Sequence, residues 1–573
     1  MRKTLLAAPL LALVTMLAVA GGEGEGVAAA GLELSAPGEY PIVQEKQTIS
    51  VIGTYDQRLA SGTLEDAKFT LWFEELTNIH IDWVEMIEWE EAVEKYNLIL
   101  ASGDLPDVLI PHSRITVQQA FDQGAAGAFV GLKDLIAEHM PGLSARLAEV
   151  PEVHKRITMP DGENYYFPIV SAGCFHCQYS TKMWVYKPWV DQLGLKWPPE
   201  TPDEFADMLR AFRDQDPNGN GKQDEIPFLS ATSGWNVDPI SFLMNAWIYT
   251  VHPYDLNYGA LLERSPSDVR FVANTEEWRD GLKYLRMLHD EELLAEESFV
   301  WTEKEAKQTT ENPDYPIVGS FQGGWFGRFT IHGGGTGRFA DFKPIPPLRG
   351  PSGLQQTRYH PPSVNVQSVI TSAAEHPAMI AKMVDWFYED PIAHALLARN
   401  FLQEGSEWRY LTEEEKKLGW VTRDGGPAKT IRLESAVYSL DLDDDGWSRT
   451  TLGNWEWNAH SAMPPEWEGD PTRVEWRLMV ATRDLMLPYR VEKHIPPDVI
   501  FQGMDQEELV DLTETITSRN GLVMQRAAEF ITGRRDIHDD ATWDAYVDEL
   551  ERAGVGRYVE LWQGALQGSG YFN

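Results

Sequence analysis

Two short apolar segments, Ile49-Ser-Val-Ile-Gly53 and Ile79-His-Ile-Asp-Trp83, decide the fold, because a helical pattern separates them. The first is uninterrupted and predicts a buried strand, whereas the second alternates apolar and polar residues as a half-buried strand does. Between them, four apolar residues recur at helical spacing and give one apolar face: Phe69, Trp72, Phe73 and Leu76. A strand, a helix and a second strand at this spacing predict a parallel α/β sheet.

The same alternation continues along the chain. Val108-Leu-Ile110 predicts another strand after the turn at Gly103–Asp107, and Val364–Ile370 predicts a later one. A chain of 573 residues is too long for one hydrophobic core, so we expect two lobes joined by more than one chain crossing. The prolines of Tyr166-Phe-Pro168 and Pro344-Ile-Pro-Pro-Leu348 suit extended crossings.

The first residues indicate an exported protein. A basic start, Met1-Arg-Lys3, precedes the uncharged apolar run Thr4–Ala20, whose last small residues suit signal-peptidase cleavage. Cleavage after Ala30 is an alternative. No later segment approaches the run of about twenty apolar residues that spans a bilayer. The predicted division is a signal peptide (1–20), a flexible tether (21–46), a first lobe (47–168 and about 350–430) and a second lobe (169–349 and about 431–573).

The composition disfavours several classes of partner. A formal net charge of −39 repels phosphate backbones and anionic lipid heads, which argues against binding of nucleic acid or a membrane surface. The hydrophobic fraction of 43% excludes general disorder. The 21 tryptophans favour a carbohydrate ligand, because sugars stack on exposed aromatic faces.

An acidic loop, residues 214–227, carries the clearest chemical signal. Its Asp and Asn residues alternate with turn-forming glycines, and hard cations such as calcium take about six to eight oxygen ligands. The loop therefore predicts a calcium site, for which the residues alone allow two registers. The first, which follows the EF-hand pattern, comprises Asp214, Asp216, Asn218, Gly219 and Glu225. The second comprises Asp216, Asn218, Asn220, the carbonyl of Lys222, Asp224 and Glu225.

The remaining motifs do not indicate catalysis. Cys174 and Cys177 lack the visible setting of a redox motif and are too few for a zinc site, so a local disulfide or two inert thiols is expected. No nucleophile elbow, P-loop or His-Glu-x-x-His motif occurs. Carboxylate pairs arise by chance among 88 acidic residues. The sequence predicts a binding protein and no enzyme.

Several stretches resemble family 1 extracellular solute-binding proteins of ABC importers, particularly the long branch that includes alginate-oligosaccharide-binding proteins. Leu100–Val108 looks like the family's S-G-D-x-P-D segment, and Pro160–Pro168 looks like its D-G-x-x-Y-x-x-P segment. Tyr186–Gly194 is similar to the Y-x-x-W-x-x-x-L-G helix. The loop Asp216–Pro227 is the strongest match, and Phe530–Gly533 with Trp543–Val547 resembles the C-terminal helices.

This resemblance implies two α/β lobes that close around a carbohydrate at a hinge, and membrane permease subunits as partners. It selects the second calcium register, from Asp216 to Glu225. The lipid-anchor cysteine of many relatives is absent after the signal sequence, which implies a periplasmic or secreted protein with no anchor through cysteine. The pair Cys174 and Cys177 is not a recognised feature of the family.

Five aromatic residues are candidate ligand contacts, of which we expect two or three to touch the sugar. Similar proteins place an aromatic ring against the sugar at the position of Tyr166. Trp235 follows a Ser-Gly turn, and Trp325 lies between glycines that leave a ring face open. Trp408 and Trp455 lie in irregular polar stretches.

Two alternatives accompany the prediction of a monomeric oligosaccharide-binding protein for an ABC importer. One is an exported carbohydrate-active hydrolase or lyase, and the other is a sugar-sensing module that passes its ligand to a receptor. Sugar binding without product formation distinguishes a binding protein from the hydrolase or lyase alternative. Neighbouring genes for two permeases distinguish an importer from a sensor.

Overall fold

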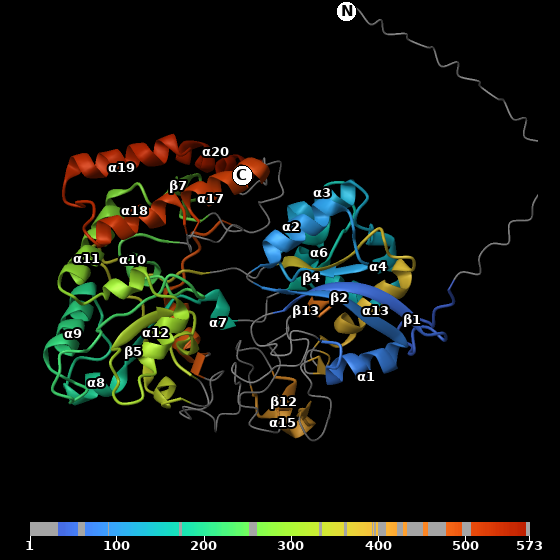
Figure 1. Cartoon of the computed structure of the whole chain (residues 1–573), viewed down its shortest axis with the longest axis horizontal. Helices are drawn as coiled ribbons and strands as arrows, with labels where there is room; N and C mark the ends of the chain where they lie inside the picture. Colours follow the sequence, from blue (N-terminus) through green and yellow to red (C-terminus); the bar gives the residue numbers. More distant parts are fainter. Residues whose placement is uncertain are drawn as a thin grey trace, which may run out of the picture.

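Two α/β lobes lie side by side in the computed structural model (Figure 1). The model describes residues 32–55, 64–89, 91–170, 175–250, 260–331, 335–359, 364–391, 394, 397–398, 408–420, 428–432, 451–455, 477–478, 480–495, 506–518 and 520–568. Each lobe contains a sheet covered by helices and its own large hydrophobic core. The predicted α/β architecture with two lobes is confirmed.

The first lobe is built on a six-stranded sheet. In sheet order its strands are β13 (Asn454–Trp455), β4 (Phe167–Val170), β10 (Val364–Ile370), β3 (Val108–Ile110), β1 (Gln47–Tyr55) and β2 (Ile79–Glu88). The strands β1, β2 and β3 are parallel, as their spacing in the sequence predicted, and Gln47 pairs with Ile79. β10 runs antiparallel to β3 and to β4, so a segment far along the chain completes the middle of the sheet.

Among the described elements, seven helices cover this sheet. They are α1 (Lys68–Thr77), α2 (Ala92–Ser102), α3 (Val117–Ala125), α4 (Lys133–His139), α5 (Pro141–Glu149), α6 (Pro151–Ile157) and α13 (Pro377–Glu389). The carboxylate of Asp385 on α13 accepts the backbone N–H groups of Gly142 at 2.9 Å and Leu143 at 2.7 Å. Burial raises the pKa of Asp385 to about 6, although the two hydrogen bonds lower it. This contact joins α5 closely to α13.

Replacing Gly142 by alanine is expected to lower the free energy of unfolding by about 1–3 kcal/mol, because the two helices must separate. An added Cβ would lie 2.7 Å from the backbone nitrogen of Glu389 and 3.0 Å from Oδ1 of Asp385. Urea unfolding measures the effect. Gly564→Ala on helix α20 is the control, because a Cβ there meets no atom within 4 Å. Equal stability of the two variants would contradict this account of the α5–α13 contact.

Residues 32–46 pack against the first lobe, although the sequence placed them in a flexible tether. Ile42 and Val43 are fully buried in its core. The hydroxyl of Tyr40 donates to Oε1 of Glu389 at 3.0 Å, and Nζ of Lys382 donates to the carbonyl of Ser35. The apolar Pro41-Ile-Val43 within a polar stretch explains the difference, because burying it offsets the cost of ordering the segment.

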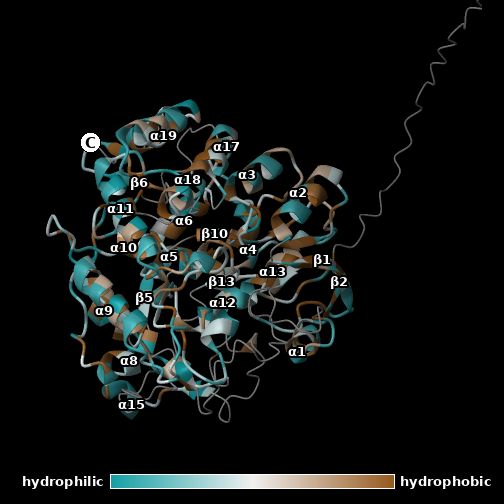
Figure 2. Cartoon of the chain, turned by 60° about the vertical axis from the view of Figure 1, so that its left-hand side comes forward, coloured by the Kyte–Doolittle hydropathy of each residue, from teal (hydrophilic) through white to brown (hydrophobic). Residues whose placement is uncertain are grey.

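The second lobe is built on a smaller antiparallel sheet. Its strands are β8 (Ser320–Gly323), β5 (Lys182–Tyr186) and β9 (Phe342–Ile345), and a separate pair is β6 (Leu262–Arg264) with β7 (Val269–Phe271). Its helices are α7 (Phe175–Gln178), α8 (Lys187–Gln192), α9 (Pro202–Asp214), α10 (Ser241–Met244), α11 (Glu276–Asp290), α12 (Glu303–Thr310), α17 (Gln506–Ile516), α18 (Leu522–Ile531), α19 (Asp540–Arg552) and α20 (Val555–Gly568). The outer surface of α9 is mainly hydrophilic, whereas apolar residues gather along the strands of the first lobe (Figure 2).

The described elements require three passes of the chain between the lobes. β4 of the first sheet is followed by β5 of the second, β9 returns to β10, and the chain leaves again after β13 for the C-terminal helices. A small unit, β11 (Trp408–Tyr410), α15 (Glu413–Lys417) and β12 (Thr430–Arg432), packs around Leu411 and Ala428. The exact lobe boundaries stay a prediction. The signal peptide lies outside the described residues.

Candidate ligand-binding and metal-binding sites

The carboxyl edge of the first sheet is the first candidate binding surface. β1, β2 and β3 are parallel, so their carboxyl ends lie at one edge. Trp89 directly follows β2, and the turn Pro111–Arg114 directly follows β3. Open α/β sheets bind ligands outside the carboxyl ends of their strands. These two segments therefore occupy the position where the fold presents ligand contacts.

The turn after β3 has an uncommon backbone. His112 and Ser113 have φ values of 43° and 68°, in the left-handed region that favours glycine. The N–H of Ser113 donates to the carbonyl of Val366 at 2.7 Å, and Nδ1 of His112 lies 3.0 Å from Oε1 of Gln367. Each such residue costs about 1–3 kcal/mol, and such residues cluster at functional sites. Two contacts to β10 hold the strained turn in place.

Trp89 stacks with two residues of this turn. The guanidinium carbon of Arg114 lies 3.6 Å from the centroid of the Trp89 ring, and the His112 ring centroid lies 5.2 Å away. Trp89 and Arg114 are half-buried, whereas His112 is buried. A planar guanidinium fixed on an aromatic ring is well placed to donate to neighbouring oxygen atoms of a ligand.

The five predicted aromatic residues are dispersed. Tyr166, Trp325, Trp408 and Trp455 are between 1% and 7% exposed, which is typical of packing residues. Tyr166 and Trp455 belong to the core of the first lobe, and Trp325 belongs to that of the second. Trp408 packs against Tyr410 in the small unit, with a distance of 5.6 Å between ring centroids. Contact between these residues and a sugar stays a prediction.

Trp235 differs from the other four because it keeps part of its surface exposed. Its ring lies against Gly324, where an added Cβ would approach Cε3 to 2.2 Å. The ring of His176 meets it edge-on, with 5.8 Å between centroids. The glycine allows an indole to lie flat on the main chain, so Trp235 is an ordered ring at the surface of the second lobe.

The chain crossings meet at Tyr359. The ring of Tyr179 lies 5.5 Å from it, that of His494 lies 5.2 Å away, and the guanidinium carbon of Arg490 lies 3.8 Å from its centroid. Thr357 also pairs with Arg490 in a short parallel bridge. Segments from all three crossings therefore share one small aromatic and cationic cluster.

Sequence reasoning missed Trp89, His112 and Arg114. A signal was present, because the alternation that begins at Ile79 continues to Glu88 and places Trp89 just beyond the strand. The turn Pro111–Arg114 likewise follows the predicted strand at once. The carboxyl ends of the predicted parallel strands, and not the tryptophan content, are the sequence signal that identifies this edge.

The acidic loop connects α9 to the sheet of the second lobe. α9 begins with Thr201, whose side chain accepts the backbone N–H of Glu204, and ends at Asp214. After the loop, Ile226 forms a parallel bridge with Val318. The loop therefore connects the end of a helix to a buried strand-like segment.

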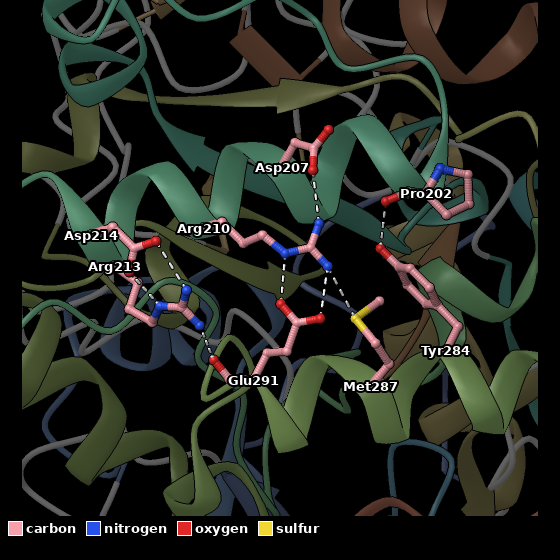
Figure 3. Close-up of polar contacts among 8 residues, drawn as sticks. All are labelled: Pro202, Asp207, Arg210, Arg213, Asp214, Tyr284, Met287 and Glu291. Carbon is pink, nitrogen blue, oxygen red and sulfur yellow. Dashed lines mark hydrogen bonds and ion pairs between the residues drawn. The ribbon is translucent and has the colours of Figure 1, made fainter.

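A polar network fixes the end of α9 against α11 (Figure 3). Arg210 donates to both carboxylate oxygens of Glu291, at 2.6 and 2.8 Å. Arg213 donates to both oxygens of Asp214, at 2.7 and 3.0 Å, and lowers the pKa of that carboxyl. The carboxylate of Asp214, which belongs only to the first register, is thus engaged by Arg213.

The side chains of Asn218, Asn220 and Asp224 contact one another, and the carboxylate of Asp216 binds the main chain of the same loop. Asp216 accepts the N–H groups of Asn220 at 3.1 Å and Gly221 at 3.0 Å. Asp224 accepts the amide groups of Asn218 and Asn220, each at 3.0 Å. Nearby, the N–H of Lys222 donates to Oδ1 of Asn220 at 2.8 Å. These hydrogen bonds link Asp216, Asn218, Asn220 and Asp224, and their role as calcium ligands stays a prediction.

Glu225 supplies the observation that points to a cation. Both of its carboxylate oxygens are inaccessible to solvent, and neither accepts a well-aligned hydrogen bond. Burial raises the pKa of Glu225, nearby backbone N–H groups lower it, and Asp216 and Asp224 raise it further. Within the described ranges, no group of three or more His, Cys, Asp or Glu side chains is arranged to hold a metal. The donor set fits a hard cation only when amide and main-chain oxygens contribute.

Cys177 is disulfide-bonded, and the sequence contains one other cysteine. The described part of the chain has no free cysteine. Of the two expectations for this pair, the local disulfide agrees with the structure.

No family model matches the chain. A curated relative, the fructooligosaccharide ABC transporter substrate-binding protein FusA of Streptococcus pneumoniae serotype 4 (strain ATCC BAA-334 / TIGR4), is 26% identical over 571 residues and 96% of each chain. The chain is a homologue of ABC-transporter substrate-binding proteins. The predicted resemblance is therefore confirmed, and this homologue carries the same length of chain as FusA.

Solved structures show that the homologue has the substrate-binding-protein fold. FusA with kestose and a FusA EF-hand mutant with fructo-nystose give TM-scores of 0.65 and 0.66 at 24% and 23% identity, and each match covers 91% of this chain and 99% of the other. An HMO-binding solute-binding protein of Bifidobacterium longum infantis gives 0.69 at 20% identity, with coverage of 91% and 99%. The alginate-binding protein AlgQ2 without calcium ion gives 0.61 at 20%, with coverage of 92% and 99%.

Among the residues described for this homologue, none of the helices is long and apolar enough for a membrane span.

Proposed function

We propose that the protein captures an oligosaccharide outside the cytoplasm and delivers it to the permease subunits of an ABC importer, without chemical change of the ligand. The observation that carries this proposal is the similarity to FusA along 96% of both chains, with 26% identity. The two-lobed fold supports it. The basic start and apolar run at residues 1–20 support export, and the protein acts as a monomer.

The ligand binds between the lobes in this proposal. Trp89 and Arg114 contact it from the carboxyl edge of the first sheet, and Trp235 contacts it from the second lobe. Ordered aromatic rings and a planar guanidinium suit a sugar, which offers apolar ring faces and hydroxyl oxygens. The cluster at Tyr359 joins all three crossings and serves as the hinge.

The acidic loop holds a structural calcium ion in this proposal. Its ligands are Asp216, Asn218, Asn220, the carbonyl of Lys222, Asp224 and Glu225. The buried carboxylate oxygens of Glu225 support this assignment, as do the engagement of Asp214 by Arg213 and the EF-hand and calcium descriptions of two relatives. When bound, the ion supplies positive charge that neutralises three crowded carboxylates.

Calorimetric titration tests the binding function. The panel contains kestose, a neutral human-milk tetrasaccharide and an alginate trisaccharide, each mixed with the purified protein in calcium buffer. One of them is expected to give saturable heat at a stoichiometry of about one and to be recovered unchanged by chromatography. Conversion of a bound sugar into products would instead show a carbohydrate-active enzyme. No heat with any class would overturn the oligosaccharide proposal.

Lobe closure is expected on binding. Addition of the binding sugar should reduce the radius of gyration measured by solution scattering, because hinge closure brings the two lobes together. The same titration with a non-binding sugar of equal length is the control. An unchanged radius at saturation would contradict a hinge mechanism.

A further inference from the structure

A fully buried lysine lies where the chain enters the second lobe. Lys182, the first residue of β5, is 0% exposed. Its Nζ donates to the carbonyl oxygen of His176 at 3.2 Å and, by a shorter bond, to that of Tyr179. Burial lowers the pKa of Lys182 to about 7, and no described carboxylate contributes to the shift. Lysines are almost never fully buried unless paired with an acidic group, so this one calls for an explanation.

Both acceptors belong to the turn that carries the disulfide. α7 contains His176 and the disulfide-bonded Cys177, and Tyr179 directly follows it. The lysine therefore fixes the main chain on both sides of Cys177. In Figure 1, α7 lies on the side of the second lobe that faces the first.

His176 extends this constraint to Trp235, because the two rings meet edge-on at 5.8 Å. The ring of Trp235 also packs against Gly324. The residue before it, Gly323, pairs with Lys182 in the sheet. Asn236, which follows Trp235 in the sequence, donates to Oγ of Ser180 at 2.7 Å. The position of the Trp235 ring is thus set by α7, by the segment after it and by the strand opposite Lys182.

Few charged groups surround this assembly. Arg358 donates to Oγ1 of Thr181 at 3.4 Å and to Oδ1 of Asn236 at 3.2 Å. Asp238 accepts from Nε2 of Gln322 at 3.2 Å. Burial raises the pKa of Tyr179, and the nearby Arg490 opposes this shift. Glu303 and Arg328 pair at 2.9 Å and also lie against this assembly, beside Gly234 and Gly323 respectively, and the ring of His176 lies within it. Lys182 itself bonds to main-chain oxygens.

We propose that Lys182 and the disulfide-bonded α7 turn form a positioning unit for Trp235, so that sugar affinity depends on the buried ammonium and on the disulfide. The inference rests on the proposed function, because it takes Trp235 as a sugar contact. Lys182 touches no ligand in this arrangement and acts through His176. It is a positioning residue.

The test follows Trp235 by fluorine NMR of full-length protein labelled with 5-fluorotryptophan. The resonance of Trp235 is assigned as the one that disappears in Trp235→Phe. Lys182→Met is expected to shift this resonance without sugar and to weaken binding of kestose, or of the panel sugar that binds, about tenfold. Lys343→Met is the matched control, because Lys343 lies on β9 of the same sheet, where it pairs with Val185, whereas Lys182 bonds to the α7 turn. It is expected to leave both readouts unchanged.

Two further measurements use the unaltered protein and remain informative if Lys182→Met does not fold. A disulfide reductant is expected to move the Trp235 resonance as the variant does. The resonance is also expected to titrate near pH 7, since the amine of Lys182 loses its proton there. The lysine variant should lack this titration although it retains His176.

The outcomes separate the two proposals. If the Trp235 resonance stays unchanged on disulfide reduction, on a change of pH and in Lys182→Met, the proposed positioning role of Lys182 is overturned even if sugar binds. Normal sugar affinity in Trp235→Phe and Trp235→Ala would also overturn it, because the ring would then not be a contact. Absence of sugar binding in the wild type would overturn the proposed function, while the resonance still reports whether Lys182 positions the ring.

Discussion

Removal of calcium is expected to lower the melting temperature of the protein by about 10 °C. A ligand present at about 1,000 times its dissociation constant stabilises the folded state by about 4 kcal/mol, and about 2–4 °C corresponds to each kcal/mol in a lobe of this size. Without the ion, Asp216, Asp224 and Glu225 repel one another on a chain of net charge −39. Differential scanning fluorimetry with a calcium chelator measures the change.

The two possible sets of calcium ligands provide the control for this experiment, because Asp214 belongs to one set and Asp224 to the other. Asp224→Ala is expected to reproduce the loss and to make the protein insensitive to chelation. Asp214→Ala should keep its sensitivity, because Arg213 already engages that carboxylate. Calcium should restore the melting temperature and magnesium should do so poorly, because magnesium is smaller and more strictly octahedral. Unchanged melting with a chelator, and no calcium by elemental analysis, would identify the loop as an acidic turn only.

Replacing Trp89 by alanine is expected to weaken oligosaccharide binding by about 1–3 kcal/mol, which corresponds to about 5- to 150-fold in the dissociation constant. The ring supports the guanidinium of Arg114 at 3.6 Å, so its removal releases a second contact as well. Titration calorimetry with the sugar that binds the wild type measures the loss.

Two other substitutions in the first lobe separate binding from stability. Trp72→Ala removes a half-buried tryptophan of α1 and is expected to leave affinity unchanged. Tyr166→Ala is expected to lower the free energy of unfolding by about 3–5 kcal/mol, because the ring is 1% exposed in the core. Wild-type affinity in Trp89→Ala would exclude the carboxyl edge as the sugar site.

The alternation of strands and helices in the sequence was sufficient to predict the parallel part of the first sheet. Ile49–Gly53 and Ile79–Trp83 lie within β1 and β2, and the apolar face from Phe69 to Leu76 lies on α1. The antiparallel insertion of β10 beside β3 could not be predicted, because Leu109 and Val369 are neighbours only through the tertiary fold. Local periodicity does not encode that pairing.

The candidate sites show the same division between local and tertiary information. The acidic loop is continuous in sequence, so its pattern of oxygen donors was visible from Asp216 to Glu225. Exposure of an aromatic ring depends on its neighbours instead. Gly327 allows the ring of Trp325 to pack closely, since an added Cβ would lie 2.3 Å from it, and that tryptophan is buried. The glycines beside Trp325 led us to predict an exposed ring face, whereas in the structure Gly327 lets that ring pack closely.

The three passes of the chain between the lobes also determine when each lobe can be completed during synthesis and export. β3 needs β10 as its antiparallel neighbour, and β4 needs β13, so the first sheet is incomplete until residues 364–370 and 454–455 have emerged. The core of the second lobe in turn includes Trp562, near the end of the chain. Contacts of such long sequence separation form slowly. In the export that we propose, neither core would be closed when the polypeptide reaches the export machinery, and an incompletely folded chain is the form that can be threaded through a membrane.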